Sequence, residues 1–214
     1  MSKRDRRSKV LRQDPHFLRN EYNGECKYDI PLLDNCSVHE ENLELISFKN
    51  IRPNDYANLD KTVHFFSDDP YIDKAYDRPE VTVERIAQYK YVLTPDFSLL
   101  TDMPIWKQID NVARSRWCGK FWQEMGLTVI PTVSWSTPQS YEFAFLGLPQ
   151  GTAVAVSTLS VRSGKTERAL FLAGYNELIT RIEPKRVYCY SKPFPEMGDE
   201  VVWIDYLRTT RRSS

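Results

Sequence analysis

The sequence has little of several features that define common classes of protein. Lys plus Arg equals Asp plus Glu at 29 each, so the 214-residue chain has no formal net charge. Nucleic-acid-binding domains usually carry a basic excess, which argues against a strongly electrostatic binder of DNA or RNA. No apolar run approaches the ~20 residues that span a membrane. The charged start, Met1 to Arg7, is followed by no apolar signal-peptide segment, which predicts a cytoplasmic protein.

Cysteine is also scarce, with four residues and no C-x2-C pair. Cys26, Cys36 and His39 are spaced as C-x9-C-x2-H, which lacks the paired hook and a clear fourth ligand of a structural zinc site. Cys118 lies in a predicted helix and Cys189 in a predicted buried strand. Both are therefore predicted to be reduced thiols in the core.

The chain contains only part of a phosphate-binding P-loop. Ser160-Val-Arg-Ser-Gly-Lys-Thr166 lies between a predicted strand and a predicted helix and ends in the Gly-Lys-Thr of such a loop. The full pattern needs a glycine where this chain has Leu159, so a triphosphate site is not expected. A helix N-terminus flanked by Arg162 and Lys165 can still bind one anion, and these two residues are candidate anion-binding residues.

Short apolar runs alternate with helix-length segments along the chain. The runs that end in polar residues most clearly are residues 91–98, 128–135, 152–158 and 186–191. This alternation indicates parallel strands covered on both faces. We predict a single α/β domain over residues 21–207, with a mainly parallel sheet of about six or seven strands. An open doubly wound sheet and an incomplete barrel both fit this pattern. Residues 1–20 are predicted to be a flexible basic arm, and residues 208–214 a basic tail.

The longest helix is predicted to open at Asp102 and Pro104 and to stop at Gly126. Its predicted buried ridge recurs every fourth residue and comprises Ile105, Ile109, Ala113, Trp117, Phe121 and Met125. Trp122 falls off this ridge, where it could stack on a base or sugar. A last strand is predicted over residues 201–204, as an antiparallel edge.

Polar residues collect where the predicted parallel strands end, which is where such sheets carry their sites. Asp69 and Asp96 are the candidate catalytic residues, and together with Asp68 they are candidate ligands of a divalent cation such as Mg²⁺. The same carboxylates could instead act as acid and base, or simply cap turns and helix N-termini. The residues predicted to bind a substrate around them are Asn111, Arg114, Ser134, Trp135, Ser157, Thr158 and Lys192.

Four motifs together resemble those of an uncharacterised family. They are Asp96-Phe-Ser98, Asn111-x-x-Arg114-x-x-Trp117, Val129-Ile-Pro-Thr-Val-Ser-Trp135 and Val154-Ala-Val-Ser-Thr158. The family occurs in phages, prophages and integrative elements of Gram-positive bacteria and carries only a domain-of-unknown-function label. The resemblance covers roughly residues 25–200. It implies a mobile-element origin and an α/β fold, with no established activity.

Three functional classes follow from these observations. The first is a phage or mobile-element accessory protein that acts as a metal-dependent enzyme on nucleic acid or a nucleotide. It ranks first because the polar residues cluster at one rim of the predicted sheet. The second is a non-catalytic protein-binding factor, such as an inhibitor of a host defence system. The third is a nucleic-acid-binding accessory protein. Nucleic acid or a host protein is the expected partner, no membrane partner is expected, and the oligomeric state is left open.

Overall fold

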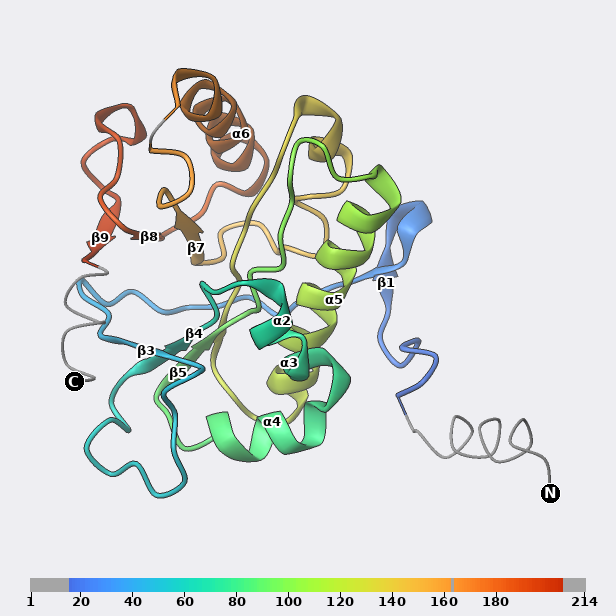
Figure 1. Ribbon diagram of the computed structural model, residues 1–214, viewed down its shortest axis with the longest axis vertical. Helices are drawn as coiled ribbons and strands as arrows, with labels where there is room; N and C mark the ends of the chain where they lie inside the picture. The colour runs from blue at the N-terminus through green and yellow to red at the C-terminus, as the bar shows by residue number, and fades with distance from the viewer. Residues whose placement is uncertain (1–15, 163, 206–214) are drawn as a thin grey trace.

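The computed structural model describes residues 16–162 and 164–205, so the predicted tail and most of the predicted arm lie outside it (Figure 1). The strands are β1 (Gly24–Glu25), β2 (Ile30–Pro31), β3 (Leu45–Ser47), β4 (Thr62–His64), β5 (Tyr91–Leu93), β6 (Val129–Ile130), β7 (Val154–Ser157), β8 (Val187–Tyr190) and β9 (Val202–Ile204). The helices are α2 (Asp69–Ile72), α3 (Lys74–Asp77), α4 (Pro79–Ile86), α5 (Ile105–Glu124) and α6 (Lys165–Ile182). Short 3-10 turns lie at η1 (Cys26–Tyr28), η2 (Pro138–Glu142) and η3 (Pro195–Met197).

The strands from β3 onward are all parallel, which confirms the predicted α/β class. They form a four-stranded sheet in the order β3-β4-β5-β6 and a three-stranded sheet in the order β7-β8-β9. The prediction of one sheet with six or seven strands is therefore wrong. In the described residues, one parallel bridge, between Thr132 and Ala155, links the backbones of the two sheets. The ladder between β5 and β6 stops because the Thr132 N–H donates to the Thr94 hydroxyl, and Pro131, whose carbonyl accepts the Ala155 N–H, has no N–H to donate toward β7.

The two sheets nevertheless enclose a shared apolar interior. Leu45, Leu93 and Ile130 from the first sheet belong to one buried cluster with Ala155 and Tyr188 from the second. The strands follow chain order without the reversal that defines a doubly wound sheet. Among the described residues no pairing joins β9 to β3.

Residues 32–44 cross the N-terminal ends of these strands. The backbone carbonyl of Cys36 accepts a hydrogen bond from the N–H of Ala153, just before β7. The hydroxyl of Tyr188 donates to the Glu40 carbonyl at 2.9 Å, and the hydroxyl of Tyr91 donates to the Glu40 carboxylate at 2.8 Å. Because this segment covers the N-terminal ends, the accessible end of the sheets is the C-terminal one.

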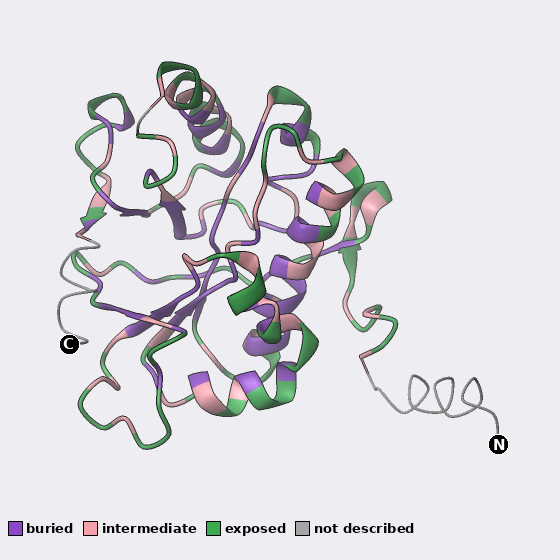
Figure 2. Ribbon diagram, in the orientation of Figure 1, coloured by how far each residue is buried: buried purple, intermediate pink, exposed green. Residues whose placement is uncertain are grey.

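Helices cover the outer faces of both sheets, and their buried faces point inward (Figure 2). Helix α5 packs beside the four-stranded sheet and ends at Glu124, with Met125 as its C-cap and Gly126 following at φ 85°, the glycine predicted to stop the helix. Cys118 on this helix and Cys189 in β8 are buried free thiols, which confirms both predictions. No helix in the described part of the chain is long and apolar enough to cross a membrane.

The predicted buried ridge of α5 is only partly correct. Trp117 and Phe121 are buried, but Met125 is 53% exposed. Half of the other buried residues of the helix are polar, namely Gln108, Asn111, Ser115 and Arg116. Trp122, predicted to lie off the ridge, is fully buried and stacks on Phe65 with ring centroids 5.4 Å apart, so it cannot stack on a ligand.

The structure differs from the prediction at both ends of the described chain. Strand β9 runs parallel to β8, so the predicted antiparallel edge is wrong. The loop that contains η3 carries the chain back to the start of the sheet, which makes a parallel pairing possible. Residues 16–20 belong to the predicted arm, yet Arg19 donates to the Tyr76 carbonyl at 2.8 Å. Its guanidinium also lies 4.0 Å from the ring centre of Trp117.

Candidate functional site

A pocket opens where the chain leaves the C-terminal ends of β4, β5, β6 and β7. Its volume is about 560 Å³, within the range of small-molecule sites. Its acidic lining residues are Asp68, Asp96, Asp102 and Glu167. Its apolar lining residues are Phe97, Leu99, Leu100, Val133, Trp135, Val161, Leu170 and Phe171. Its hydroxyl-bearing lining residues are Ser67, Ser98, Thr101, Ser134, Ser136, Ser157 and Ser160. We call this cavity the rim pocket.

Asp96 lies in the rim pocket just beyond the end of β5. The chain is fixed there by Thr94, whose hydroxyl accepts the N–H of Thr132 at 2.8 Å and whose carbonyl accepts the Thr132 hydroxyl at 2.8 Å. Desolvation raises the pKa of Asp96 to about 7, and the charge of Asp69 adds to the rise, while a hydrogen bond with Ser134 opposes it. This carboxyl is therefore held between its two protonation states near neutral pH.

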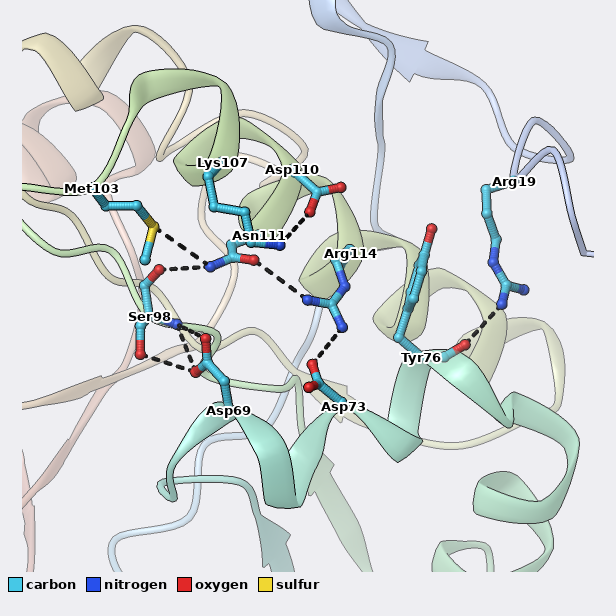
Figure 3. A network of polar contacts seen from close by, with 10 residues as sticks. All are labelled: Arg19, Asp69, Asp73, Tyr76, Ser98, Met103, Lys107, Asp110, Asn111 and Arg114. Atoms are coloured by element: carbon cyan, nitrogen blue, oxygen red, sulfur yellow. Dashed lines mark hydrogen bonds and ion pairs between the residues drawn. The ribbon is translucent and has the colours of Figure 1, made fainter.

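Asp69 is the first residue of α2 but does not cap it with its side chain. Its carboxylate accepts hydrogen bonds from the Ser98 hydroxyl at 2.9 Å and from the Ser98 N–H at 3.1 Å (Figure 3). Asp68, the residue before the helix, is exposed and makes no side-chain cap bond. Neither Asp68 nor Asp69 therefore caps the start of α2 with its side chain. Asp69 instead fixes the loop that carries Asp96.

Asn111 and Arg114 extend this arrangement from α5 rather than reaching the rim pocket. The fully buried Asn111 amide donates to the Ser98 carbonyl at 2.7 Å, and Arg114 donates to Asp73 at 2.6 Å and to Asn111 at 3.4 Å. Figure 3 shows a chain of polar contacts between α2 and α5 that joins Asp69, Ser98, Asn111, Arg114 and Asp73, which we call the Ser98 network. Neither residue lines the rim pocket, but Asn111 contacts its lining residue Ser98 and Arg114 lies over the ring of its lining residue Phe97.

Three of the predicted substrate-binding residues do line the rim pocket. Ser134 and Trp135 follow β6, and Ser157 ends β7. The indole of Trp135 packs on α6 at Gly174, where an added Cβ would lie 2.2 Å from the indole nitrogen. The absence of a side chain at Gly174 is thus what lets Trp135 form this wall.

The remaining predicted residues lie beside the pocket and not in its lining. Thr158 is fully buried, and its hydroxyl donates to the Lys192 carbonyl at 2.9 Å. Arg162 donates to the same carbonyl at 2.6 Å, while the Lys192 side chain is exposed. Thr158 and Arg162 therefore tie the loop after β7 to the loop after β8.

The predicted anion position at the start of α6 is already next to a carboxylate. Gly164 precedes the helix, and a Cβ there would lie 1.6 Å from a carboxylate oxygen of Glu167. An acidic side chain over the first turn satisfies the positive end of the helix dipole. A second anion would meet this charge, so Arg162 and Lys165 are left as two exposed cations without a shaped anion site.

Asp68, Asp69 and Asp96 do not fit a divalent cation. In residues 16–162 and 164–205, no group of three or more His, Cys, Asp or Glu is arranged to hold a metal ion. Magnesium requires near-octahedral oxygen ligands, and the Asp69 carboxylate is already occupied by Ser98. The predicted Mg²⁺ site stays a prediction that this geometry does not support.

Sequence reasoning missed two acidic residues of the pocket. Asp102 was interpreted only as a helix-opening residue, and Glu167 was not singled out. A signal existed for Glu167, because it lies three residues after Gly164, the spacing at which an acidic side chain turns back over a helix start. The buried pair of Gln108 and Ser136, joined by a 2.6 Å hydrogen bond below the rim, was also missed.

The family assignment follows from comparison with known proteins. The profile of a family described as "Domain of unknown function (DUF4417)" matches residues 22–207. The chain belongs to this family. The resemblance drawn from the four motifs is thereby confirmed, since all four lie within the matched residues.

Two phage proteins are similar in sequence to this chain. The "Gene 1 protein" of Mycobacterium phage L5 is 44% identical over 142 residues, which cover 66% of this chain and 62% of the phage protein. The "Gene 1 protein" of Mycobacterium phage D29 is 38% identical over 199 residues, which cover 89% of this chain and 73% of the phage protein. The chain thus spans less than two thirds of the L5 protein. No solved structure matches this chain.

Proposed function

We propose that this DUF4417 protein is an enzyme that binds a small organic molecule in the rim pocket and moves a proton through the Asp96 carboxyl. The observation that carries this proposal is the placement of Asp96 in a cavity of about 560 Å³ with apolar walls. A catalytic acid or base works best when its pKa is close to the operating pH. Shielding from water, with a smaller contribution from the Asp69 charge, raises the pKa of Asp96 to about 7.

The surrounding residues support proton transfer by fixing the carboxyl in place. Ser134 hydrogen-bonds to Asp96 from the neighbouring strand end. The Ser98 network fixes the loop two residues further on, through the 2.9 Å bond from Ser98 to Asp69. A carboxyl that is oriented from two sides can exchange a proton with a bound substrate without prior rearrangement. Asp96 is the catalytic residue of this proposal, and Ser134, Ser98 and Asp69 are positioning residues.

The nucleic-acid form of the prediction has less support from the geometry. The described lining of the rim pocket includes no Lys, Arg or His, whereas a site for phosphate groups needs cationic partners or a metal. The three candidate metal ligands do not form a cation site among the described residues. A small neutral or cationic substrate therefore fits the rim pocket better than a nucleotide or a nucleic acid strand.

A non-catalytic protein-binding role is the second candidate, because apolar side chains are exposed near the pocket. Leu100 lines the rim pocket and is 54% exposed, and Trp106, in the first turn of α5, is 70% exposed. Exposed aromatic residues are typical anchors of protein interfaces. If the protein acts by binding a host factor, Trp106→Ala abolishes its effect while Asp96→Asn does not.

The catalytic proposal is tested by following small molecules in a bacterial extract. The extract, freed of macromolecules, is incubated with the wild type, with Asp96→Asn, or with Asp110→Asn, and analysed by mass spectrometry. Asp110 is the matched control because it is exposed on α5, pairs with Lys107 and does not line the pocket. We expect the wild type and Asp110→Asn to convert the same compound, and Asp96→Asn to leave it unchanged. Identical profiles for all three proteins and the untreated extract would overturn the proposal.

A further inference from the structure

We propose that the ligand of the rim pocket is an organic cation. Its ammonium or similar group is directed at Asp96, and its apolar body lies against the aromatic side chains of Phe97, Trp135 and Phe171. This inference rests on the proposed function and narrows it to a class of substrate. It rests on three observations together: the cavity, the acidic charge of its lining and the aromatic side chains in that lining.

The charge of the pocket lining is entirely acidic. Asp68, Asp96, Asp102 and Glu167 contribute four carboxyl groups, and no lining residue is basic. The chain as a whole contains equal numbers of acidic and basic residues, so this lining is strongly biased relative to the rest of the molecule. A concave surface with one sign of charge and apolar walls concentrates ligands of the opposite sign.

Three basic residues around the pocket, Arg114, Arg162 and Arg168, have partners that lie outside its lining. Arg114 lies behind the wall, 4.1 Å from the ring centre of Phe97, and forms an ion pair with Asp73 at 2.6 Å. Arg162 donates to the Lys192 carbonyl, and Arg168 pairs with Glu196 at 2.7 Å. The carboxyl groups inside the pocket therefore have no cationic side chain in its lining to neutralise them.

The aromatic residues of the lining suit the body of such a ligand. Phe97, Trp135 and Phe171 line the pocket, and the rings of Trp135 and Phe171 lie 5.1 Å apart between centroids. Aromatic faces attract cations electrostatically as well as covering apolar atoms. Aromatic residues beside carboxylates form the usual environment for an amine, whereas a phosphate or carboxylate ligand would meet like charges.

Binding of a cation should also depend on pH through Asp96. The charge that acts on this carboxyl is that of Asp69, which is fixed by Ser98, and the other charged residues of the pocket lining are Asp68, Asp102 and Glu167, all of them acidic. A bound cation favours the ionised form of Asp96, whose pKa is raised to about 7 by desolvation. The affinity for a cation should therefore rise roughly tenfold between about pH 6 and about pH 8, as Asp96 loses its proton.

Three indoles with the same ring and the same two-carbon side chain test the charge preference. Tryptamine is a cation over this pH range, tryptophol is neutral and indole-3-acetate is an anion. Binding is measured by titration of the isotope-labelled full chain, following the amide resonances of Asp96 and Trp135. We expect tryptamine to bind at least about tenfold more tightly than indole-3-acetate near pH 8, with tryptophol between them. In Asp96→Asn and Glu167→Gln this preference should shrink, while Asp110→Asn keeps it.

The possible outcomes separate this inference from the proposed function. Equal affinity for the three indoles, or tightest binding of indole-3-acetate, would overturn the cation inference and leave a small-molecule pocket in place. No perturbation of the pocket resonances by any indole at millimolar concentration would also overturn it. The conversion of a compound in the bacterial extract is measured independently, so its loss or persistence decides the proposed function by itself.

Discussion

Asp96 has a pKa near neutrality because its carboxyl is shielded from water at the end of β5. Desolvation raises this pKa to about 7, well above the ~3.9 of a solvated aspartate. The folded protein therefore binds more protons than the unfolded chain between about pH 4 and about pH 7. Over that range the free energy of unfolding falls as the pH rises, because ionising the shielded carboxyl costs stability in the folded state alone.

Replacing Asp96 with asparagine removes this cost. Near pH 8 we expect Asp96→Asn to be more stable than the wild type by on the order of 2 kcal/mol, after allowing for solvent at the rim. Near pH 4, where the wild-type carboxyl is neutral, the difference should largely disappear. Urea unfolding at both pH values measures it. A stability difference that does not change with pH would show that Asp96 is not the group with the raised pKa.

Ser98 is the link between Asp69 and the loop that carries Asp96. Its hydroxyl donates to the Asp69 carboxylate at 2.9 Å, and hydrogen bonds to charged groups contribute more than neutral ones. We expect Ser98→Ala to lower the free energy of unfolding by about 1.5–3 kcal/mol. The control is Thr166→Ala on the exposed side of α6, which should change it by less than about 0.5 kcal/mol. Equal denaturant midpoints for the two variants would contradict the role given to Ser98.

At the scale of the element, α5 buries an aromatic surface at its C-terminal half. Trp117 is 2% exposed and stacks on Phe121 with ring centroids 5.3 Å apart. Trp117→Ala should therefore cost about 3–5 kcal/mol. Lys107 lies on the same helix and makes only a surface pair with Asp110, so Lys107→Ala should cost less than about 0.5 kcal/mol. Thermal and urea unfolding of both variants measure these values, and a similar loss in both would mean that the buried face is misassigned.

Helix α6 has a glycine in its interior, Gly174, because the side chain of Trp135 packs against the helix at that position. Gly→Ala inside a helix usually raises stability by about 0.5–1 kcal/mol, because alanine restricts the unfolded chain. At Gly174 the added Cβ would lie 2.2 Å from the Trp135 indole nitrogen. We therefore expect the opposite sign, a loss of about 1–3 kcal/mol, together with a shifted Trp135 fluorescence spectrum. A stabilised Gly174→Ala variant would show that Trp135 does not pack on α6.

At the scale of the whole molecule, the parallel strands and their polar ends could be predicted from the sequence. Buried runs such as Val154-Ala-Val156 are short and apolar, and helix-length connections rule out hairpins between them. The division into two sheets could not be predicted in this way. It depends on contacts such as the hydrogen bond from the Thr132 N–H to the Thr94 hydroxyl, and on the stacking of the Phe66 and Tyr190 rings between the two sheets.

The candidate site could be predicted in outline but not in its contacts. The rule that sites lie at the C-terminal ends of parallel strands brings Asp96, Ser134, Trp135 and Ser157 to one pocket. It cannot show that Asn111 is fully buried and bound to the Ser98 carbonyl, since a polar residue on a helix is normally predicted to face solvent. Contacts between segments far apart in the sequence decide which residues line the pocket and which position the lining residues, so the sequence alone does not reveal them.

The most direct test of the account is the titration of the Asp96 carboxyl itself. The ¹³C carboxyl shift of Asp96, assigned by its absence in Asp96→Asn, is followed against pH in the wild-type chain. The account predicts a midpoint close to the value of about 7 that desolvation and the charge of Asp69 give this group. A midpoint near 4, that of a solvated aspartate, would contradict both the shielded environment of Asp96 and its proposed role in proton transfer.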